Sequence, residues 1–349
     1  NQRGGNMSKV NKYLKRVKII SDKNNKSFII TIIDIIISYI FYGVTLTDYE
    51  NYEFCKKSMK ERKKYAVVRT QNKFYERVSP SKYKEFFTIK PNFLKNFKKY
   101  IGRSYYIPEF GIDKLNEFLN NNKEFIIKPI DGLGGADVRK ESSKNIKNIK
   151  DFMKKLEDEN LFLEELIIQH KKMSTLCKES VNTLRIMTFV NNGKSEILYA
   201  VLRVGNGTCE VDNFHKGGMG IEINTRTGKL RGNGIDKDLN EYKKHPVTNI
   251  YFDKFQLPFW DETKKLVLNA ALVNENIKVV GWDVAITKTG PILVEGNRRP
   301  GFDIVQDISG RWLAVVKLIN PLYSTFVFSF TADPFLVVTM TTPFAPREP

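Results

Sequence analysis

The sequence is poor in residues that build disulfide frameworks or zinc sites. Its 349 residues include only three cysteines and three histidines. The cysteines (Cys55, Cys177 and Cys209) are widely spaced and match no zinc-ligand pattern. We therefore expect neither a disulfide-stapled fold nor a zinc module, and we predict a reducing compartment, the cytoplasm. The histidines are too scattered along the chain to predict a metal cluster.

The sequence also has no clear signal peptide, because its first residues are polar and charged. The longest apolar run, residues 28–46, is nearly long enough to span a bilayer. However, Asp34 lies near its middle and Ser38 and Tyr39 follow. We therefore expect a buried or interfacial helix rather than a membrane span.

Acidic residues are outnumbered by basic ones, 39 to 57, which gives a formal net charge of +18. Such an excess is typical of proteins that bind nucleic acids or anionic surfaces. Lysine, asparagine and isoleucine are abundant throughout, and no compact arginine-rich patch occurs. We interpret the charge mainly as a compositional bias that also attracts anionic substrates. Nucleic acid is not expected as a partner, and a basic protein that binds nucleic acid or a membrane surface remains an alternative.

The order of apolar and turn-forming segments predicts an α+β protein, with an apolar content of 41% that suits a globular core. Helices are expected over most of residues 9–122, then at 145–159 and 258–274. Strands are expected at 124–130, 161–169, 183–190, 197–204 and 219–224, followed by a hairpin at 279–297. Residues 309–349 are rich in Phe, Thr, Val and Pro and nearly free of lysine. We treat them as an atypical tail with no assigned function.

The predicted hairpin places two carboxylates against each other. If its turn centres on Thr289, Asp283 pairs with Glu295, and Asn297 lies on the same face. Leu293 would share that face, whereas Val284, Ile286, Ile292 and Val294 would face the core. Opposed carboxylates repel unless a cation lies between them, and three oxygen ligands suit Mg²⁺. A solvated hairpin with an accidental acidic pair is the alternative.

A second group of residues suits phosphate binding. Lys128 lies on the expected strand 124–130, and the glycine-rich loop 131–138 follows directly. A strand lysine can neutralise phosphate oxygens, and glycines let backbone N–H groups approach them. The segment fits neither a P-loop nor a dinucleotide-binding fingerprint. Together with the acidic hairpin, it indicates an enzyme that holds ATP and Mg²⁺.

Two arginines and one glycine-rich segment lie between these groups. Arg185 and Arg203 lie on neighbouring predicted strands, and either could instead be an exposed strand residue. Residues 211–220 (VDNFHKGGMG) combine glycines with His215 and indicate a loop close to a ligand. His215 is a candidate general base, although a hydrogen-bonded loop histidine is the alternative.

These segments together resemble the ATP-grasp superfamily, and more closely its sugar-transfer-associated family. The resemblance covers about residues 30–308. Its most specific part is the pattern D-x₁₁-E-x-N-x₂-P-G in VGWDVAITKTGPILVEGNRRPGFDIVQ (residues 280–306). Further matching segments are IIKPIDGLGG (126–135), FLEELIIQH (162–170), VNTLRIMT (181–188) and LRVGNGTCEVDNFHKGGMG (202–220).

The resemblance implies an ATP-grasp fold, in which two α+β subdomains clasp ATP, with a helical N-terminal region. We predict a helical region at 7–100, a subdomain with a glycine flap at 101–168, a core subdomain with the metal site at 169–308, and the tail at 309–349. The residues implied in ATP binding are Lys90 and Lys128 at the phosphates, Gly132, Gly134 and Gly135 in the flap, and Glu164, Glu165, Leu166 and Ile167 as the hinge along the adenine. Asp283, Glu295 and Asn297 match the Mg²⁺ ligands.

The function implied is ATP- and Mg²⁺-dependent ligation of a carboxylate to an amine or thiol through an acyl phosphate, in the modification of a cell-surface sugar or amino-acid precursor. Arg185, Arg299 and His215 are the candidate catalytic residues. Arg203, Asn213, Gly217 and Gly218 are the candidate substrate-binding residues. A kinase that phosphorylates a small-molecule hydroxyl is the enzymatic alternative, and contact with a membrane surface stays open.

Overall fold

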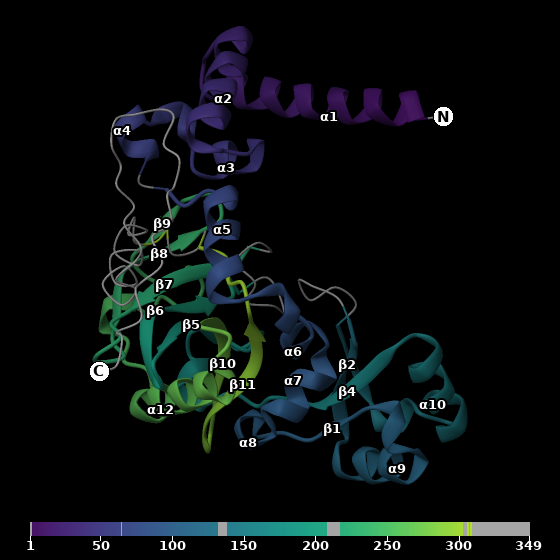
Figure 1. The fold of residues 1–349 in the computed structure, drawn as a ribbon. Helices are drawn as coiled ribbons and strands as arrows, with labels where there is room; N and C mark the ends of the chain where they lie inside the picture. Colours follow the sequence, from purple (N-terminus) through teal and green to yellow (C-terminus); the bar gives the residue numbers. More distant parts are fainter. Residues whose placement is uncertain are drawn as a thin grey trace, which may run out of the picture. The chain divides into compact units, whose positions relative to one another are not determined.

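The computed structural model describes residues 2–63, 65–131, 138–207, 217–302, 306 and 308, with side chains from residue 10 onward. The described chain divides between Tyr75 and Glu76 into two compact units. Each unit is described by itself below (Figure 1).

The first unit is helical, as the sequence predicts for this region. Its helices are α1 (Gln2–Lys23), α2 (Phe28–Tyr42), α3 (Leu46–Asn51), η1 (Phe54–Lys56) and α4 (Met59–Arg62), and α5 (Val68–Val78) begins in it. Gly43 ends α2 with a φ of 68°, a left-handed conformation that glycine adopts without strain. Thr45 and Asp48 then start α3 with a reciprocal capping box.

The apolar run that could have spanned a bilayer forms α2, whose Asp34 is held inside the first unit. Its carboxylate accepts hydrogen bonds from the Arg62 guanidinium at 2.7 and 2.8 Å and from the Tyr49 hydroxyl at 2.5 Å. This ion pair offsets the cost of placing a charge on an apolar helix. Among the described residues, no single helix is long and apolar enough to cross a membrane; α1 and α2 meet that test only as a pair bent by 110°.

The second unit contains two antiparallel sheets. The smaller one has the order β1-β4-β2-β3, from β1 (Tyr105–Tyr106), β2 (Glu124–Pro129), β3 (Arg139–Ser142) and β4 (Leu161–Glu165). Helices α9 (Ile112–Asn121) and α10 (Ile149–Asp158) pack on it through a core that includes Leu115, Phe125 and Leu156.

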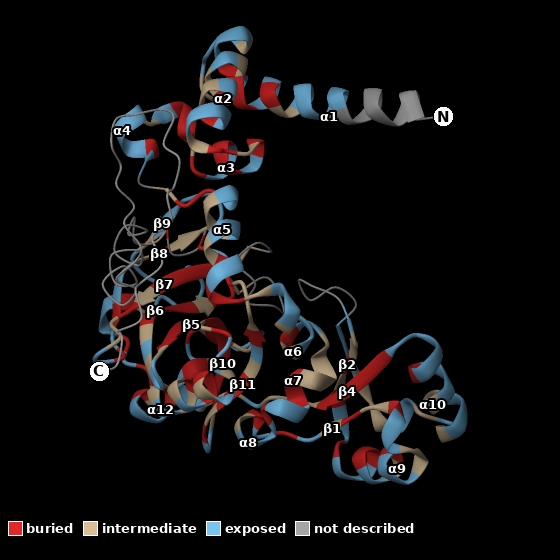
Figure 2. Cartoon of the chain, viewed as in Figure 1, coloured by how far each residue is buried: buried red, intermediate tan, exposed pale blue. Residues whose placement is uncertain are grey.

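The larger sheet has seven strands in the order β11-β10-β5-β6-β7-β8-β9. They are β5 (Thr183–Asn191), β6 (Lys194–Val204), β7 (Met219–Ile223), β8 (Leu230–Asp236), β9 (Glu241–Tyr242), β10 (Val279–Thr287) and β11 (Gly290–Asn297). Helix α12 (Trp260–Ala271) packs on this sheet, with η6 (Phe252–Lys254) and η7 (Leu272–Asn274) nearby in sequence. Buried residues concentrate on central strands such as β5 and β10 (Figure 2).

Short helices precede and join the two sheets: η2 (Ser81–Tyr83), α6 (Glu85–Thr88), α7 (Lys90–Asn96), α8 (Lys98–Ile101), η3 (Pro108–Phe110), η4 (Ser143–Asn145) and α11 (Lys171–Ser174). Phe87 and Phe97 from this group pack edge-on against Trp282 of β10, with ring centroids 5.9 and 5.2 Å apart from it. The segment 76–101, which the sequence analysis grouped with the N-terminal helices, thus packs on the large sheet. The α+β class predicted from the sequence is confirmed.

Some predicted boundaries were wrong. The strand expected at 161–169 ends at Glu165, and the helix expected at 145–159 begins at Ile149 because Asn148 caps it through the N–H groups of Lys150 and Asp151. Strands β1, β3, β8 and β9 were not predicted, since they are short or polar and carry little alternation of apolar side chains.

Candidate active site

The hairpin β10–β11 brings the two predicted carboxylates together, as the sequence predicts. Asp283 pairs with Glu295 and Gly281 pairs with Asn297 in the strand register. Directly opposed residues have Cβ atoms roughly 4.5–5.5 Å apart, within reach of one shared cation. The predicted pairing of Asp283 with Glu295 is therefore confirmed by the strand register.

The predicted faces of β11 were partly wrong. The hairpin closes with Thr287 paired to Gly290, which shifts the register by one residue, and a β-bulge near Val294 restores it before Glu295. Consequently Leu293 pairs with Val284 and joins the core, whereas Ile292 pairs with Ala285 on the other face.

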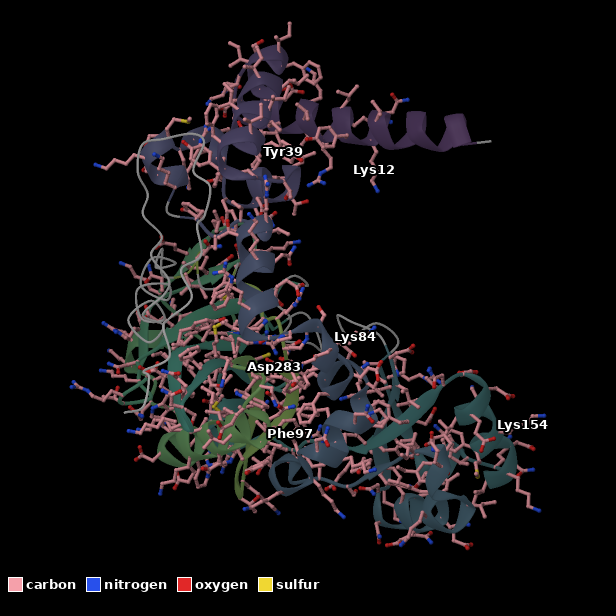
Figure 3. All side chains as sticks on the ribbon, viewed as in Figure 1. Lys12, Tyr39, Lys84, Phe97, Lys154 and Asp283 are labelled. Atoms are coloured by element: carbon pink, nitrogen blue, oxygen red, sulfur yellow. The ribbon has the colours of Figure 1, made fainter. Side chains whose placement is uncertain are left out.

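Two arginines hold the Asp283 carboxylate. Arg185 on β5 donates from Nε to Oδ1 at 2.6 Å and from a terminal nitrogen to Oδ2 at 3.2 Å. Arg203 on β6 lies 3.0 Å from the same Oδ2. Asp283 is 6% exposed and is labelled in Figure 3. The predicted catalytic and substrate-binding arginines thus meet at the predicted metal ligand, where they place two positive charges.

Glu295 lies beside this pair, but among the described residues it has no ion-pair partner of its own. Burial raises its pKa, and repulsion from Asp283 raises it further, against the opposing effect of Arg185 and Lys128. The Nδ2 atom of Asn297 is buried without a hydrogen-bond partner. A cation between Glu295 and Asp283 would relieve this repulsion, and the two carboxylates with the Oδ1 atom of Asn297 would supply the oxygen ligands that Mg²⁺ prefers. No group of three or more His, Cys, Asp or Glu residues gathers in the described part of the chain, so this set of two carboxylates and one amide is the candidate.

The predicted phosphate-binding lysine lies on the small sheet and pairs with a buried glutamate. Lys128 on β2 forms an ion pair with Glu164 on β4. Arg103 contacts the other Glu164 oxygen at 2.7 Å. Burial alone would raise the Glu164 pKa, but Arg103 and Lys128 overcome it and lower the pKa to about 2. Glu164 therefore stays ionised and fixes the position of Lys128.

Arg103 was missed by the sequence analysis. Besides Glu164, its guanidinium donates to the carbonyl oxygens of Leu293 at 2.5 Å and Val294 at 3.1 Å. These carbonyls belong to the bulge of β11, next to Glu295. Arg103 thus links the hairpin that carries the carboxylates to the strand that positions Lys128. A lone arginine in GRSYY gives no sequence signal for this role, because its partners are distant in the chain.

Lys90, at the start of α7, is brought to the same place. Its ammonium donates to the Pro129 carbonyl oxygen at 2.9 Å, and its backbone N–H donates to Ile130. Burial lowers its pKa, and Lys128 lowers it further, whereas Glu295 opposes the shift. Two lysines close to each other favour binding of a polyanion that neutralises both.

Several of these groups line one cavity of about 290 Å³. Its walls include Lys90, Lys128, Glu164, Glu295, Asn297 and Arg299, with Phe87, Phe93, Leu94 and Phe162 on the apolar side. The combination of an apolar wall, two lysines and an acidic edge suits a nucleotide, whose base is apolar and whose phosphates are charged.

Other predicted residues lie around this cavity or outside the described chain. The Arg299 side chain pairs with Glu76 and hydrogen-bonds Ser81. The Glu165 carboxylate accepts from the N–H of Ser104 at 2.9 Å, and Leu166 and Ile167 follow β4 as half-buried residues. Gly217, with a φ of 99°, and Gly218 precede β7, and Gly220 of that strand pairs with Arg203. The remaining predictions, Gly132, Gly134, Gly135, Asn213 and His215, lie outside the described residues.

The sequence profile of the sugar-transfer associated ATP-grasp family matches residues 56–316, most of the chain. The protein belongs to this ATP-grasp family. The resemblance and the ATP-grasp fold expected from the motifs are therefore confirmed. ATP and Mg²⁺ are typical cofactors of the family.

Solved structures that are similar to this chain include an ATP-grasp ligase and two synthetases. The ligase PsnB, solved with a minimal precursor, is 16% identical, with 80% of this chain and 77% of that chain covered and a TM-score of 0.43. The D-cycloserine synthetase DcsG is 12% identical, with coverage of 73% and 80% and a TM-score of 0.43. The D-alanyl-alanine synthetase A of Vibrio cholerae is 13% identical, with coverage of 68% and 66% and a TM-score of 0.37. A comparison with curated proteins gave no match.

Proposed function

We propose that this ATP-grasp protein is an ATP-dependent ligase that joins a carboxylate to an amine or thiol through an acyl phosphate. The observation that carries the proposal is that Glu295 and Asn297 line one cavity together with Lys90 and Lys128, while Asp283 is paired with Glu295 in the strand register. This arrangement separates an acidic edge from a basic phosphate-binding region, as a nucleotide with a divalent cation requires.

Each described group has a role in the proposed reaction. Lys90 and Lys128 neutralise the phosphate oxygens, and Glu164 holds Lys128 in place. Asp283, Glu295 and Asn297 would hold Mg²⁺, which when bound neutralises charge on the phosphates. Arg185 and Arg203 lie next to these ligands, where they orient an anionic substrate.

In the first proposed step, a substrate carboxylate oxygen forms a bond to the γ-phosphorus of ATP, the bond from that phosphorus to the β,γ-bridging oxygen breaks, and ADP leaves. In the second step, a neutral amine attacks the acyl carbon, inorganic phosphate leaves, and the amine gives up a proton. Arg185 is the proposed stabiliser of the negative oxygen that forms on the acyl carbon. Arg299 remains a second candidate for this role, and His215 the proposed base.

We further propose that the reaction takes place in the cytoplasm, on a precursor of a cell-surface sugar or an amino acid. Support for a reducing compartment comes from Cys55 and Cys177, which are free and buried in the described structure. Support for surface polysaccharide as the destination comes from the sugar-transfer association in the family description.

The proposal is tested by assaying purified protein with ATP, Mg²⁺ and a panel of amino acids and sugar acids. We expect ADP and inorganic phosphate in equal amounts, only when a carboxylate and an amine or thiol are both present. Glu295→Ala should lower turnover by about 10²-fold or more, since it removes a proposed ligand of the Mg²⁺ that would stabilise the charged transition state. Glu196→Ala, an exposed glutamate on β6 of the same sheet, should leave turnover unchanged.

Two results would contradict the proposal. ADP formation without free phosphate, with a phosphorylated product in the mass spectrum, would assign a kinase instead. Full turnover of Glu295→Ala would show that the acidic edge of the cavity is not the metal site.

A further inference from the structure

Helix α2 exposes a row of large apolar side chains on the face opposite the one that it buries. One face, with Thr31, Ile35 and Ser38, is buried in the first unit. The other face is open to solvent, with Ile29 67%, Ile30 60%, Ile33 51%, Ile36 50%, Ile40 64% and Phe41 57% exposed. Ile29, Ile33, Ile36 and Ile40 follow the helical repeat and form one continuous stripe. Single exposed apolar residues are common, but a continuous stripe of this kind marks a surface that something covers.

Helix α1 adds both apolar and basic side chains next to this stripe in sequence. Val10, Tyr13, Leu14 and Ile19 of α1 are exposed. Residues 10–42 contain six basic and only two acidic residues. Asp34 is paired with Arg62 inside the unit, Asp22 pairs with Lys18, and Arg16 pairs with Glu50. The outer surface of the pair is thus apolar and positively charged, and Figure 3 labels Lys12 and Tyr39 on its two helices.

The charge decides between two occupants of this surface. A second copy of the chain would bring the same excess of positive charge against itself, which opposes association. A bilayer with anionic headgroups attracts the lysines and receives the isoleucines in its hydrocarbon boundary. We propose that the surface formed by α1 and the outer face of α2 binds the surface of an anionic lipid bilayer.

The length of α2 determines how it lies in the bilayer. Its 15 residues extend over roughly 22 Å at the α-helical rise, short of a hydrocarbon core about 30 Å thick. The helix therefore lies in the plane of the interface, with Tyr39 and Phe41 at the depth where aromatic side chains are enriched. This binding would bring the enzyme to substrates carried on lipids, although it does not depend on the proposed reaction.

The test is sedimentation of the full chain with vesicles of phosphatidylcholine alone and with vesicles in which about one third of the lipid is phosphatidylglycerol. We expect binding to the anionic vesicles, at least about tenfold stronger than to the neutral ones, that weakens as salt is raised. Ile33→Glu/Ile40→Glu should lower this binding at least about tenfold, because both side chains would carry charge into the interface. Lys12→Glu/Lys15→Glu should also weaken it, without touching the apolar stripe.

The matched control is Val273→Glu, an exposed apolar residue of the second unit that is 42% exposed; it should bind vesicles as the unchanged chain does. Melting curves and ATP binding of all variants should match the unchanged chain, which separates this test from the proposed function. Equal binding of the Ile33→Glu/Ile40→Glu variant, or no vesicle binding at all, would overturn the proposal. A dimer in solution that this variant converts to monomers would overturn it too, and would assign the stripe to a second copy.

Discussion

At the scale of single residues, the Asp283 and Glu295 carboxylates differ in their ion pairs. Asp283 forms ion pairs with Arg185 and Arg203. The pKa of Glu295 is raised by its burial and by repulsion from Asp283. In the free protein Glu295 therefore holds its proton to a higher pH than an ordinary glutamate does. A bound cation reverses this preference, because it binds only the ionised carboxylate.

We therefore predict that binding of ATP and Mg²⁺ releases a proton and weakens as the pH falls. The weakening should begin above the pH at which an ordinary glutamate titrates, since the Glu295 pKa is raised, and should approach about tenfold per pH unit below that pKa. Calorimetry in buffers with different ionisation enthalpies measures the released proton. Glu295→Gln serves as the control and should release none from this position; proton release that is identical in both proteins would refute the assignment.

At the scale of elements, the hairpin β10–β11 has the predicted pair of carboxylates although its turn differs from the predicted one. The predicted turn centred on Thr289, but the true turn pairs Thr287 with Gly290, and the bulge near Val294 compensates. Residues 292, 293 and 294 are all apolar. Without a polar residue among them, the sequence does not show which of these side chains face the core. The pairing of Asp283 with Glu295 was predicted correctly because the bulge cancels the one-residue error in the predicted turn.

Arg103 shows what sequence reading cannot supply. Its partners lie on β4 and β11, 61 and 190–191 residues away along the chain. No spacing rule connects such positions, and only the folded second unit reveals that one guanidinium joins the two sheets. By contrast, Lys128 and the glycine loop could be predicted as a phosphate-binding group, since they are adjacent in sequence.

We predict that Arg103→Met lowers the free energy of unfolding by about 3–5 kcal/mol, because it leaves Glu164 buried with one cation fewer and the bulge carbonyls without donors. ATP should also bind more weakly, since Glu164 would no longer be held by Arg103 and would position Lys128 less firmly. Chemical denaturation and ATP titration measure the two effects. Arg139→Met is the control: its ion pair with Glu159 is long, at 3.7 Å, and exposed, so a loss of only about 0–1 kcal/mol is expected. Equal losses of unfolding free energy in the two variants would show that Arg103 contributes no more to stability than an exposed ion pair.

At the scale of the whole molecule, the described chain has two units with different chemistry. The helices of the first unit carry the apolar and basic surface, whereas the cavity lies entirely within residues 76–309. The helical character of the N-terminal region was predictable from its apolar periodicity. The border between Tyr75 and Glu76 was not, because α5 runs through it without a break in composition.

We predict that ATP with Mg²⁺ stabilises the second unit selectively. At a ligand concentration about 100 times the dissociation constant, the gain is about 2.7 kcal/mol, which for a domain of this size raises the melting temperature by roughly 5–10 °C. Trp260 and Trp282 are buried in the second unit, so in a Trp312→Phe background their fluorescence follows that unit alone. Circular dichroism of the same sample includes the helices of the first unit and should show a second transition that the ligand does not move. A single transition that shifts as a whole would mean that the two units unfold together, and no shift in fluorescence would mean that the cavity does not bind the nucleotide.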